Sequence, residues 1–310
     1  MTPRLGYLCL CDNPSAEDGR ALTRQFVLVR EADRMGYDEI WIGEQHFESL
    51  WPTGAIVALL GHLTAVTSKA RIGALPLVAA LHDPLRLAED LATLDLLSKG
   101  RLNLAVASGG ALAPALRRFG IDPAAARART LEVLALAQQR LADDPGLVPR
   151  PAQPALPTWI ASADPATLAQ AARNGLGLAG AATHPEARVR AAVAHYANAA
   201  DARLVLARFG CSAATRAEAI ALARPYFETF AQHARAAGWG ADPKRSMAQD
   251  VDALVEHSLV GSHAEVAAKI GRLGSELGVA SIAVVPTSAQ FDTHKHILAD
   301  FVDEVRPLLE

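Results

Sequence analysis

Short apolar runs alternate with amphipathic segments along nearly the whole chain. The runs predict strands at residues 5–10, 39–43, 71–77, 101–107, 158–161, 177–180, 203–209 and 281–285. The segments between them predict helices at residues 20–35, 54–67, 84–99, 124–142, 185–198, 216–236, 265–277 and 295–308, and a further helix that begins near residue 164. Residues 145–157 are rich in proline and predict a surface excursion.

Eight strand–helix units within 310 residues predict a (β/α)8 TIM barrel. A doubly wound open sheet is the alternative, because strand–helix alternation alone does not separate the two architectures. No G-x-G-x-x-G motif follows the first strand, so the dinucleotide-binding form of the open sheet loses support. We therefore expect one barrel domain over residues 1–310. An insertion is expected before the last strand, at about residues 238–259, where the apolar pattern is less periodic.

The helix after the third strand carries the clearest end signals in the chain. Asp83 is a natural N-cap, and Pro84 suits the first helical position. Gly100 can adopt the left-handed conformation that closes a helix. These signals predict the limits of this helix independently of its apolar stripe, which consists of Leu87, Leu91 and Leu94.

The amino-acid composition limits the kinds of partner that the chain can bind. Hydrophobic residues make up 51% and charged residues 20%, with a formal net charge of -3. These values exclude a disordered chain and a basic nucleic-acid-binding protein. No apolar run approaches the roughly 20 residues of a membrane helix, and no secretion signal is recognisable. Cys9, Cys11 and Cys211 are too few for a disulfide framework. We expect a cytoplasmic protein that acts on a small molecule, with no membrane or nucleic-acid partner.

Functional side chains of a (β/α)8 barrel gather after the carboxyl ends of its strands. Glu44, Gln45 and His46 follow the second predicted strand. A carboxylate two residues from an imidazole suits acid–base chemistry or hydrogen bonding to a polar ring, whereas backbone capping and pairing with an arginine are the structural alternative. Leu75 and Pro76 end the third strand, where the proline either stops the strand or forms a cis peptide bond beneath a flat ligand.

Small residues follow the fourth and fifth strands. Ser108, Gly109 and Gly110 either let backbone N–H groups approach a ligand or form a flexible turn. Ser162 and Ala163 precede a helix whose N-terminus can receive an anion, although the aspartate that follows them is the expected N-cap.

The histidines do not predict a metal site. His294 and His296 begin the last predicted helix without a neighbouring pair of cysteine or carboxylate ligands, which favours surface histidines. His82 and Asp83 can form a proton relay, but Asp83 is already required as a helix cap. No metal is therefore expected.

Four segments of the chain resemble the bacterial luciferase-like flavin-dependent monooxygenases. They read GYDEIWIGEQHF at residues 36–47, ARIGALPL at 70–77, HDPLRLAEDLATLDLLSKGRLNLAVASGG at 82–110 and RRFGID at 117–122. Weaker similarity follows in LVGSHAEVAAKI at residues 259–270 and GVASIAVVP at 278–286. The resemblance covers almost the whole chain and has the expected order of elements.

The resemblance implies a barrel whose C-terminal mouth binds a flavin, usually reduced FMN that a separate reductase supplies. In that chemistry the reduced flavin reacts with O2 to oxidise a small organic substrate, while the protein excludes water and orients the substrate. Relatives commonly dimerise through the region of the helices at residues 54–67 and 85–97. Both helices are apolar over more than one face, so we expect a homodimer.

The resemblance also assigns roles to individual positions. Glu44 matches an acidic residue of the family, and Gln45 and His46 match two positions that are often both histidine. Gln45 is not a base at neutral pH, so His46 is the imidazole candidate. Leu75 and Pro76 match the place of an unusual peptide bond under the isoalloxazine ring, which predicts a cis bond between them.

Ser108 stands where many relatives have an arginine that contacts the flavin phosphate. A serine hydroxyl can hydrogen-bond to phosphate but does not balance its charge. Backbone amides can compensate for this charge, and the candidates are those of Ser108, Gly109, Gly110, Ser162 and Ala163. Two other functions therefore stay open. One is an oxidoreductase that uses the deazaflavin coenzyme, and the other is a non-catalytic flavin-binding or partner subunit with a degraded site.

Overall fold

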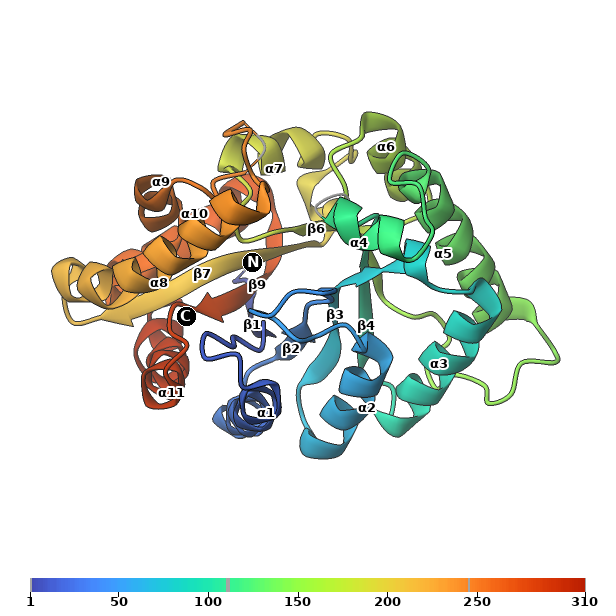
Figure 1. The fold of residues 1–310 in the computed structure, drawn as a ribbon, viewed down its shortest axis with the longest axis horizontal. Helices are drawn as coiled ribbons and strands as arrows, with labels where there is room; N and C mark the ends of the chain where they lie inside the picture. The colour runs from blue at the N-terminus through green and yellow to red at the C-terminus, as the bar shows by residue number, and fades with distance from the viewer. Residues whose placement is uncertain (1, 110–111, 245, 310) are drawn as a thin grey trace. The chain divides into compact units, whose positions relative to one another are not determined.

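The computed structural model describes residues 2–109, 112–244 and 246–309, and Figure 1 shows their fold. Contacts within the chain divide it into two compact units. The N-terminal unit consists of Cys9–Asp33 and Ile40–Ala161. The C-terminal unit consists of Met1–Leu8, Arg34–Glu39 and Ser162–Glu310.

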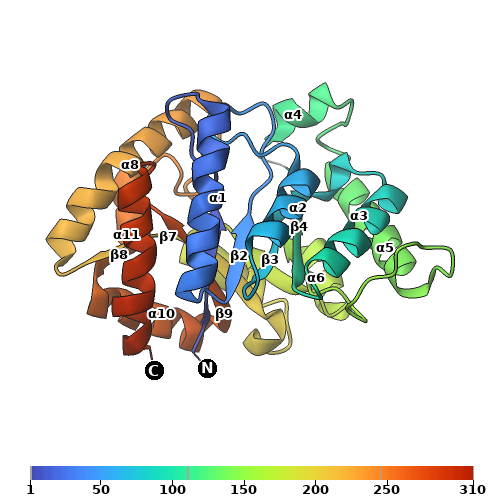
Figure 2. The same cartoon turned by 90° about the horizontal axis from the view of Figure 1, so that it is seen from below.

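The N-terminal unit contains a parallel sheet and the helices that follow its strands. Its elements, two of which extend beyond its limits, are α1 (Asp18–Met35), β2 (Glu39–Ile42), α2 (Ile56–Val66), β3 (Arg71–Val78), η1 (Ala79–Leu81), α3 (Pro84–Leu97), β4 (Leu102–Ala107), α4 (Ala113–Arg118), α5 (Ala126–Asp143) and β5 (Thr158–Ala161). β4 pairs in parallel with β3 on one side and with β5 on the other. Helices α2, α3 and α5 pack in succession along these strands, as Figures 1 and 2 show.

The C-terminal unit is built around the long strand β7. Its elements are β1 (Arg4–Cys9), α6 (Pro165–Arg173), β6 (Gly177–Gly180), α7 (Glu186–Val193), η3 (Ala199–Ala202), β7 (Leu204–Ala213), α8 (Arg216–Ala237), α9 (Val251–His257), β8 (Leu259–Ser262), α10 (His263–Leu277), β9 (Val279–Pro286), α11 (Phe291–Asp300), the π-helical turn η4 (Phe301–Val305) and η5 (Arg306–Leu308). β7 pairs in parallel with β6, β8 and β9, and β9 pairs in parallel with β1. Nine of the ten residues of β7 are buried, as expected for a strand covered on both faces.

The strand order identifies the fold class. Hydrogen-bonded neighbours follow the order β6-β5-β4-β3-β2-β1-β9-β7, and β7 also pairs with β6. Eight strands with intervening helices therefore close into a (β/α)8 barrel, and β8 is an additional strand beside β7. The predicted barrel is confirmed, and the open sheet is not the architecture of this chain.

The predicted start of α3 is confirmed, while the helix ends at Leu97, two residues before the predicted end, and Lys99 already has a left-handed φ of 59°. The carboxylate of Asp83 accepts hydrogen bonds from the backbone N–H groups of Leu85 and Arg86, both at 3.0 Å. Pro84 is the first helical residue, and Gly100 follows the helix with φ of 76°. Among the helices of the residues described, none combines the length and the apolarity that crossing a membrane requires.

Among the described residues, two short α-helices and one short strand were not predicted. α4 has six residues and lies in the predicted loop after β4, while α9 and β8, with seven and four residues, occupy the end of the predicted insertion and the residues after it. Segments of one or two turns show no readable period, and they form only where tertiary packing stabilises them. The predicted eighth strand consequently corresponds to β9.

Candidate active site

Glu44 is a buried carboxylate that the backbone of two strands holds in place. It follows β2, whose four residues are all buried, and Glu44 itself is only 2% exposed. Its backbone N–H donates to the carbonyl oxygen of Pro76 at 3.1 Å, and its Oε2 accepts a short hydrogen bond from the N–H of Val78. The carboxylate is therefore fixed against the end of β3.

His46, two residues further along the same loop, contacts the same carboxylate. Its Nε2 lies 2.7 Å from Oε1 of Glu44. An ionised carboxylate only accepts hydrogen bonds, so Nε2 carries the hydrogen and Nδ1 keeps its lone pair. A Cβ at Gly54 would lie 3.1 Å from Nδ1, so the glycine leaves room on that side of the ring. The structure therefore brings the predicted residues Glu44 and His46 together, and the carboxylate orients the imidazole ring. Gln45, which lies between them in the sequence, is half-buried.

His82 is the third side chain beside this carboxylate, with Glu44 and His46, and its position in the sequence does not predict the contact. It lies between η1 and α3, and its Nε2 is 3.7 Å from Oε1 of Glu44. Its predicted partner in a relay, Asp83, instead caps α3. A histidine before a helix cap has no sequence signal that points to a carboxylate in another loop, so only the fold identifies this neighbour.

The environment of Glu44 keeps its carboxyl group ionised. Burial raises the pKa of this group, but the imidazoles of His46 and His82 and the N–H of Val78 outweigh burial and hold the pKa below its usual value. The negative charge is consequently present at neutral pH. Such a charge stabilises a neighbouring imidazolium, which suits acid–base chemistry at His46.

The predicted cis peptide bond between Leu75 and Pro76 is present. Leu75 is buried and Pro76 is half-buried, and both lie within β3. The carbonyl of Pro76 accepts from the N–H of Glu44, so the structure brings two of the predicted site segments together. A Cβ at Gly43 would lie 3.4 Å from the carbonyl oxygen of Leu75, which shows how closely the two segments approach.

The residues after β4 reach the same end of β3. Gly109 is buried with φ of 70°, and a Cβ there would lie 2.7 Å from Cγ1 of Val78. Both the left-handed conformation and the lack of space require glycine at this position. Ser108 is half-buried beside it, and Gly110 lies outside the described residues.

Ser162 and Ala163 belong to the C-terminal unit and form the turn before α6. The Oγ of Ser162 accepts from the N–H of Asp164 at 3.1 Å, and Ala163 is exposed. The carboxylate of Asp164 accepts from the N–H of Thr167 at 2.9 Å, which confirms the expected N-cap. Because this carboxylate already occupies the helix N-terminus, an anion there would meet a negative neighbour.

An exposed aromatic cluster lies beside His46, and it too was not predicted. Phe47 is 58% exposed and Phe119 is 48% exposed, and their ring centroids are 5.4 Å apart. Phe119 also meets the ring of His46 edge-on at 5.1 Å, and the guanidinium of Arg118 lies 3.7 Å from the centroid of Phe47. Phe47 has φ of 55°, an uncommon conformation for a bulky residue. The cluster forms an apolar surface next to the imidazole.

The expectation of surface histidines in the last helix is wrong for His294. This residue is 2% exposed, with Nδ1 2.9 Å from the carbonyl oxygen of Ser288 and Nε2 3.0 Å from the hydroxyl of Tyr7. Burial lowers the pKa of His294 to about 4, so it is neutral at pH 7. His296 is exposed, as expected. Within the described ranges, no group of three or more His, Cys, Asp or Glu side chains is placed to hold a metal ion.

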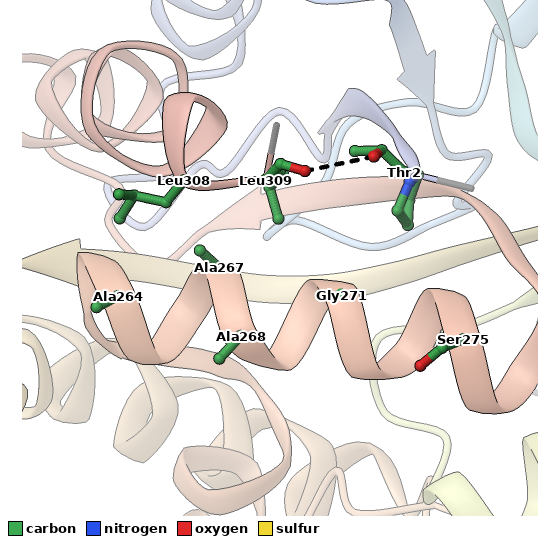
Figure 3. Close-up of a pocket in the computed structure, with 9 residues that line it drawn as sticks. Thr2, Ala264, Ala267, Ala268, Gly271, Ser275, Leu308 and Leu309 are labelled. Atoms are coloured by element: carbon green, nitrogen blue, oxygen red, sulfur yellow. Dashed lines mark hydrogen bonds between the residues drawn. The ribbon is translucent and has the colours of Figure 1, made fainter.

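The C-terminal unit also contains a groove of about 550 Å3, which Figure 3 shows. One wall is the face of α10 that carries small residues, and the other comes from the two ends of the chain, where the hydroxyl of Thr2 donates to the carbonyl of Leu309 at 3.3 Å. The lining consists of Thr2, Pro3, Ala264, Ala267, Ala268, Gly271, Ser275, Leu308 and Leu309. This lining has no titratable side chain, so the groove offers no acid–base chemistry.

Comparison with known protein families identifies the class. Residues 3–281 match the luciferase-like monooxygenase family, and the chain belongs to this family. Among characterised relatives, 4-hydroxyprotoasukamycin monooxygenase from Streptomyces nodosus subsp. asukaensis is 31% identical over 43% of this chain and 36% of its own length. The chain spans about half or less of the first curated relatives that it matches.

Solved structures agree with the fold. Monooxygenase RslO1 from Streptomyces bottropensis has a TM-score of 0.82 at 21% identity and covers 98% of this chain and 99% of its own. The oxygenating constituent of 3,6-diketocamphane monooxygenase from Pseudomonas putida, solved with FMN, has a TM-score of 0.79 at 16% identity over 100% and 99%. An F420-dependent secondary alcohol dehydrogenase has a TM-score of 0.74 at 16% identity over the whole of both chains.

Proposed function

We propose that this protein is a flavin-dependent monooxygenase that uses reduced FMN and O2 to oxidise a small organic molecule. The observation that carries the proposal is the hydrogen-bonded pair of the buried Glu44 and the half-buried His46 beside the Leu75–Pro76 segment, in a chain of the luciferase-like monooxygenase family. A related monooxygenase at 31% identity and an FMN-bound structure of the same fold support it. A separate flavin reductase, a homodimer, a single domain over residues 1–310 and a cytoplasmic location complete the proposal.

The residues of the N-terminal unit fit the ring of a flavin better than its phosphate. Leu75 and Pro76 would lie under the isoalloxazine ring, and the close approach of Gly43 to Leu75 keeps side chains away from that backbone. For the phosphate, Ser108 and the backbone N–H of Gly109 would donate hydrogen bonds without a balancing charge. Bound reduced FMN would supply the electrons that activate O2.

The protein's own part in the reaction is proton handling and water exclusion. His46 would exchange a proton with the substrate, and the negative charge of the nearby Glu44 would favour the imidazolium form of the ring. Phe47 and Phe119 would bind the apolar part of the substrate beside the imidazole and exclude water from it.

A deazaflavin-dependent oxidoreductase is the second candidate, because the F420-dependent alcohol dehydrogenase shares the fold over the whole chain. A non-catalytic subunit is the third, and the neutral residues Gln45 and Ser108 motivate it. The ionised carboxylate of Glu44 and the orientated ring of His46 favour a catalytic protein over this third function.

Anaerobic titration tests the proposed function. We expect the purified protein to bind reduced FMN. When O2 is added, we expect a transient absorbance spectrum that matches neither reduced nor oxidised flavin. The same titration with reduced deazaflavin coenzyme distinguishes the second candidate. Binding of the deazaflavin without binding of reduced FMN would contradict the proposal, and binding of neither would favour the third candidate.

An arginine at position 108 is expected to strengthen binding of the flavin phosphate. The variant Ser108→Arg should bind FMN about tenfold more tightly than the native protein, because it adds a charge-assisted hydrogen bond worth roughly 1.4 kcal/mol. Binding of riboflavin, which has no phosphate, should stay the same. The exposed Ser15→Arg provides a control with an equal change in net charge. Equal effects of the two variants would show that Ser108 does not face the phosphate.

A further inference from the structure

His82 has a buried nitrogen that the proposed reaction leaves unexplained. Its Nε2 is shielded from solvent and has no hydrogen-bond partner in the described part of the chain. The nearest acceptor is Oε1 of Glu44 at 3.7 Å, about 0.5 Å beyond the range of a hydrogen bond. Buried polar groups without partners are rare in folded proteins, and a functional role is one of their common explanations.

The tautomer of His82 follows from its neighbour. A lone pair on Nε2 would face the negative oxygen of Glu44 and be repelled, so Nε2 carries a hydrogen that points at Oε1. The competing carboxylate of Asp83 is occupied by the backbone N–H groups of Leu85 and Arg86. Two imidazole N–H groups, those of His46 and His82, are therefore directed at one oxygen, and only His46 is within bonding distance.

In this arrangement one oxygen of Glu44 depends on His46 for its hydrogen bond, and a reaction that moves His46 would remove that bond. Its Oε2 is held by the N–H of Val78, and its Oε1 by His46. If the ring of His46 moves toward a substrate, Oε1 becomes a buried anionic oxygen that lacks this donor. An unpaired charged group in a protein interior is strongly unfavourable, so a replacement donor is required.

We propose that His82 is a positioning residue that takes over Oε1 of Glu44 when His46 moves its N–H from the carboxylate to the substrate. The proposal rests on the monooxygenase function proposed above. No bond other than a hydrogen bond forms or breaks in this step. His82 keeps its proton and shortens its distance to Oε1, so the carboxylate stays ionised and in place until His46 returns.

The variant His46→Phe imitates the departure of His46 and tests this exchange without flavin or substrate. In a crystal structure of the variant we expect Nε2 of His82 within 2.7–3.2 Å of Oε1 of Glu44. In the control variant His296→Gln, which changes an exposed side chain, the separation should stay near 3.7 Å. A separation that stays near 3.7 Å in His46→Phe, or a different donor on Oε1, would overturn the proposal.

Unfolding in urea supplies a second measurement on the same protein. The variant His82→Phe keeps a ring but removes the N–H, and it should lower the folding equilibrium constant about tenfold more in the His46→Phe background than in the native one. Equal effects in the two backgrounds would overturn the proposal. His46→Leu replaces His46→Phe if the larger ring prevents folding.

Activity is the third readout once the flavin function is established. His82→Phe should lower kcat about tenfold or more with no change in the KM for reduced FMN. His82→Gln, which keeps an N–H donor, should restore most of this loss. Failure of reduced FMN to bind would refute the proposed function, whereas the structural and unfolding results decide the role of His82 separately.

Discussion

Replacing Glu44 with alanine is expected to lower the free energy of unfolding by about 3 kcal/mol, because two groups then lose their acceptor in a buried site. They are the backbone N–H of Val78 and the Nε2–H of His46, and each unsatisfied donor costs roughly 1–3 kcal/mol. Urea unfolding at pH 7 measures the change. Glu89→Ala removes a surface carboxylate of α3 and should stay within about 0.5 kcal/mol of the native protein.

The same carboxylate predicts a dependence of stability on pH. Its pKa is lower in the folded protein than the usual value of 4.5, so the unfolded chain binds the proton more readily. Glu44 therefore stabilises the fold above that pH, and this contribution is lost as the pH falls through the folded pKa. The difference in unfolding free energy between the native protein and Glu44→Gln should be largest near pH 7 and shrink below about pH 4.5. A difference that grows on acidification would contradict the lowered pKa.

Gly73→Ala is expected to destabilise the protein by roughly 3 kcal/mol or more, an overpacking effect at the upper end of its range. The new Cβ would collide with the carbonyl oxygen of Asn103 and lie 2.8 Å from Cζ3 of Trp41. The carbonyl is part of the backbone of β4, which pairs with β3 at this position, so it cannot move without disturbing the sheet. Thermal unfolding measures the effect as a lower Tm.

Gly61→Ala is the matched control for this prediction. Gly61 lies within α2, and a Cβ there would be 4.0 Å from Cδ2 of Leu94, an ordinary contact. Alanine favours helix over glycine by about 1 kcal/mol, so this variant should be as stable as the native protein or more stable. Similar losses at both positions would show that the close approach of β3 and β4 does not limit residue 73.

Much of the candidate site was predictable because its signals are local. Glu44 and His46 lie two residues apart in one loop, so a shared hydrogen bond needs only the strand end that precedes them. The cap at Asp83 likewise depends on neighbouring residues, whereas the cis bond before Pro76 was predicted from the resemblance to the luciferase-like family. His82 and Phe119 were not predicted as site residues. They contact Glu44 and His46, which are distant in the sequence, and only the fold brings them together.

The sequence by itself determined most of the strand and helix segments and their capping, because periodic burial and end signals are properties of short segments. Strand–helix alternation fits an open sheet as well as a barrel, so the closure of the barrel is seen only in the structure, where β7 also pairs with β6. Only the tertiary structure decided that Oε1 of Glu44 faces two imidazoles, that Phe47 and Phe119 form an exposed surface beside His46, and that His294 is buried. These contacts depend on the parallel register of strands and on the paths of loops between them. Register and loop path are set by packing over the whole domain, which no short segment encodes.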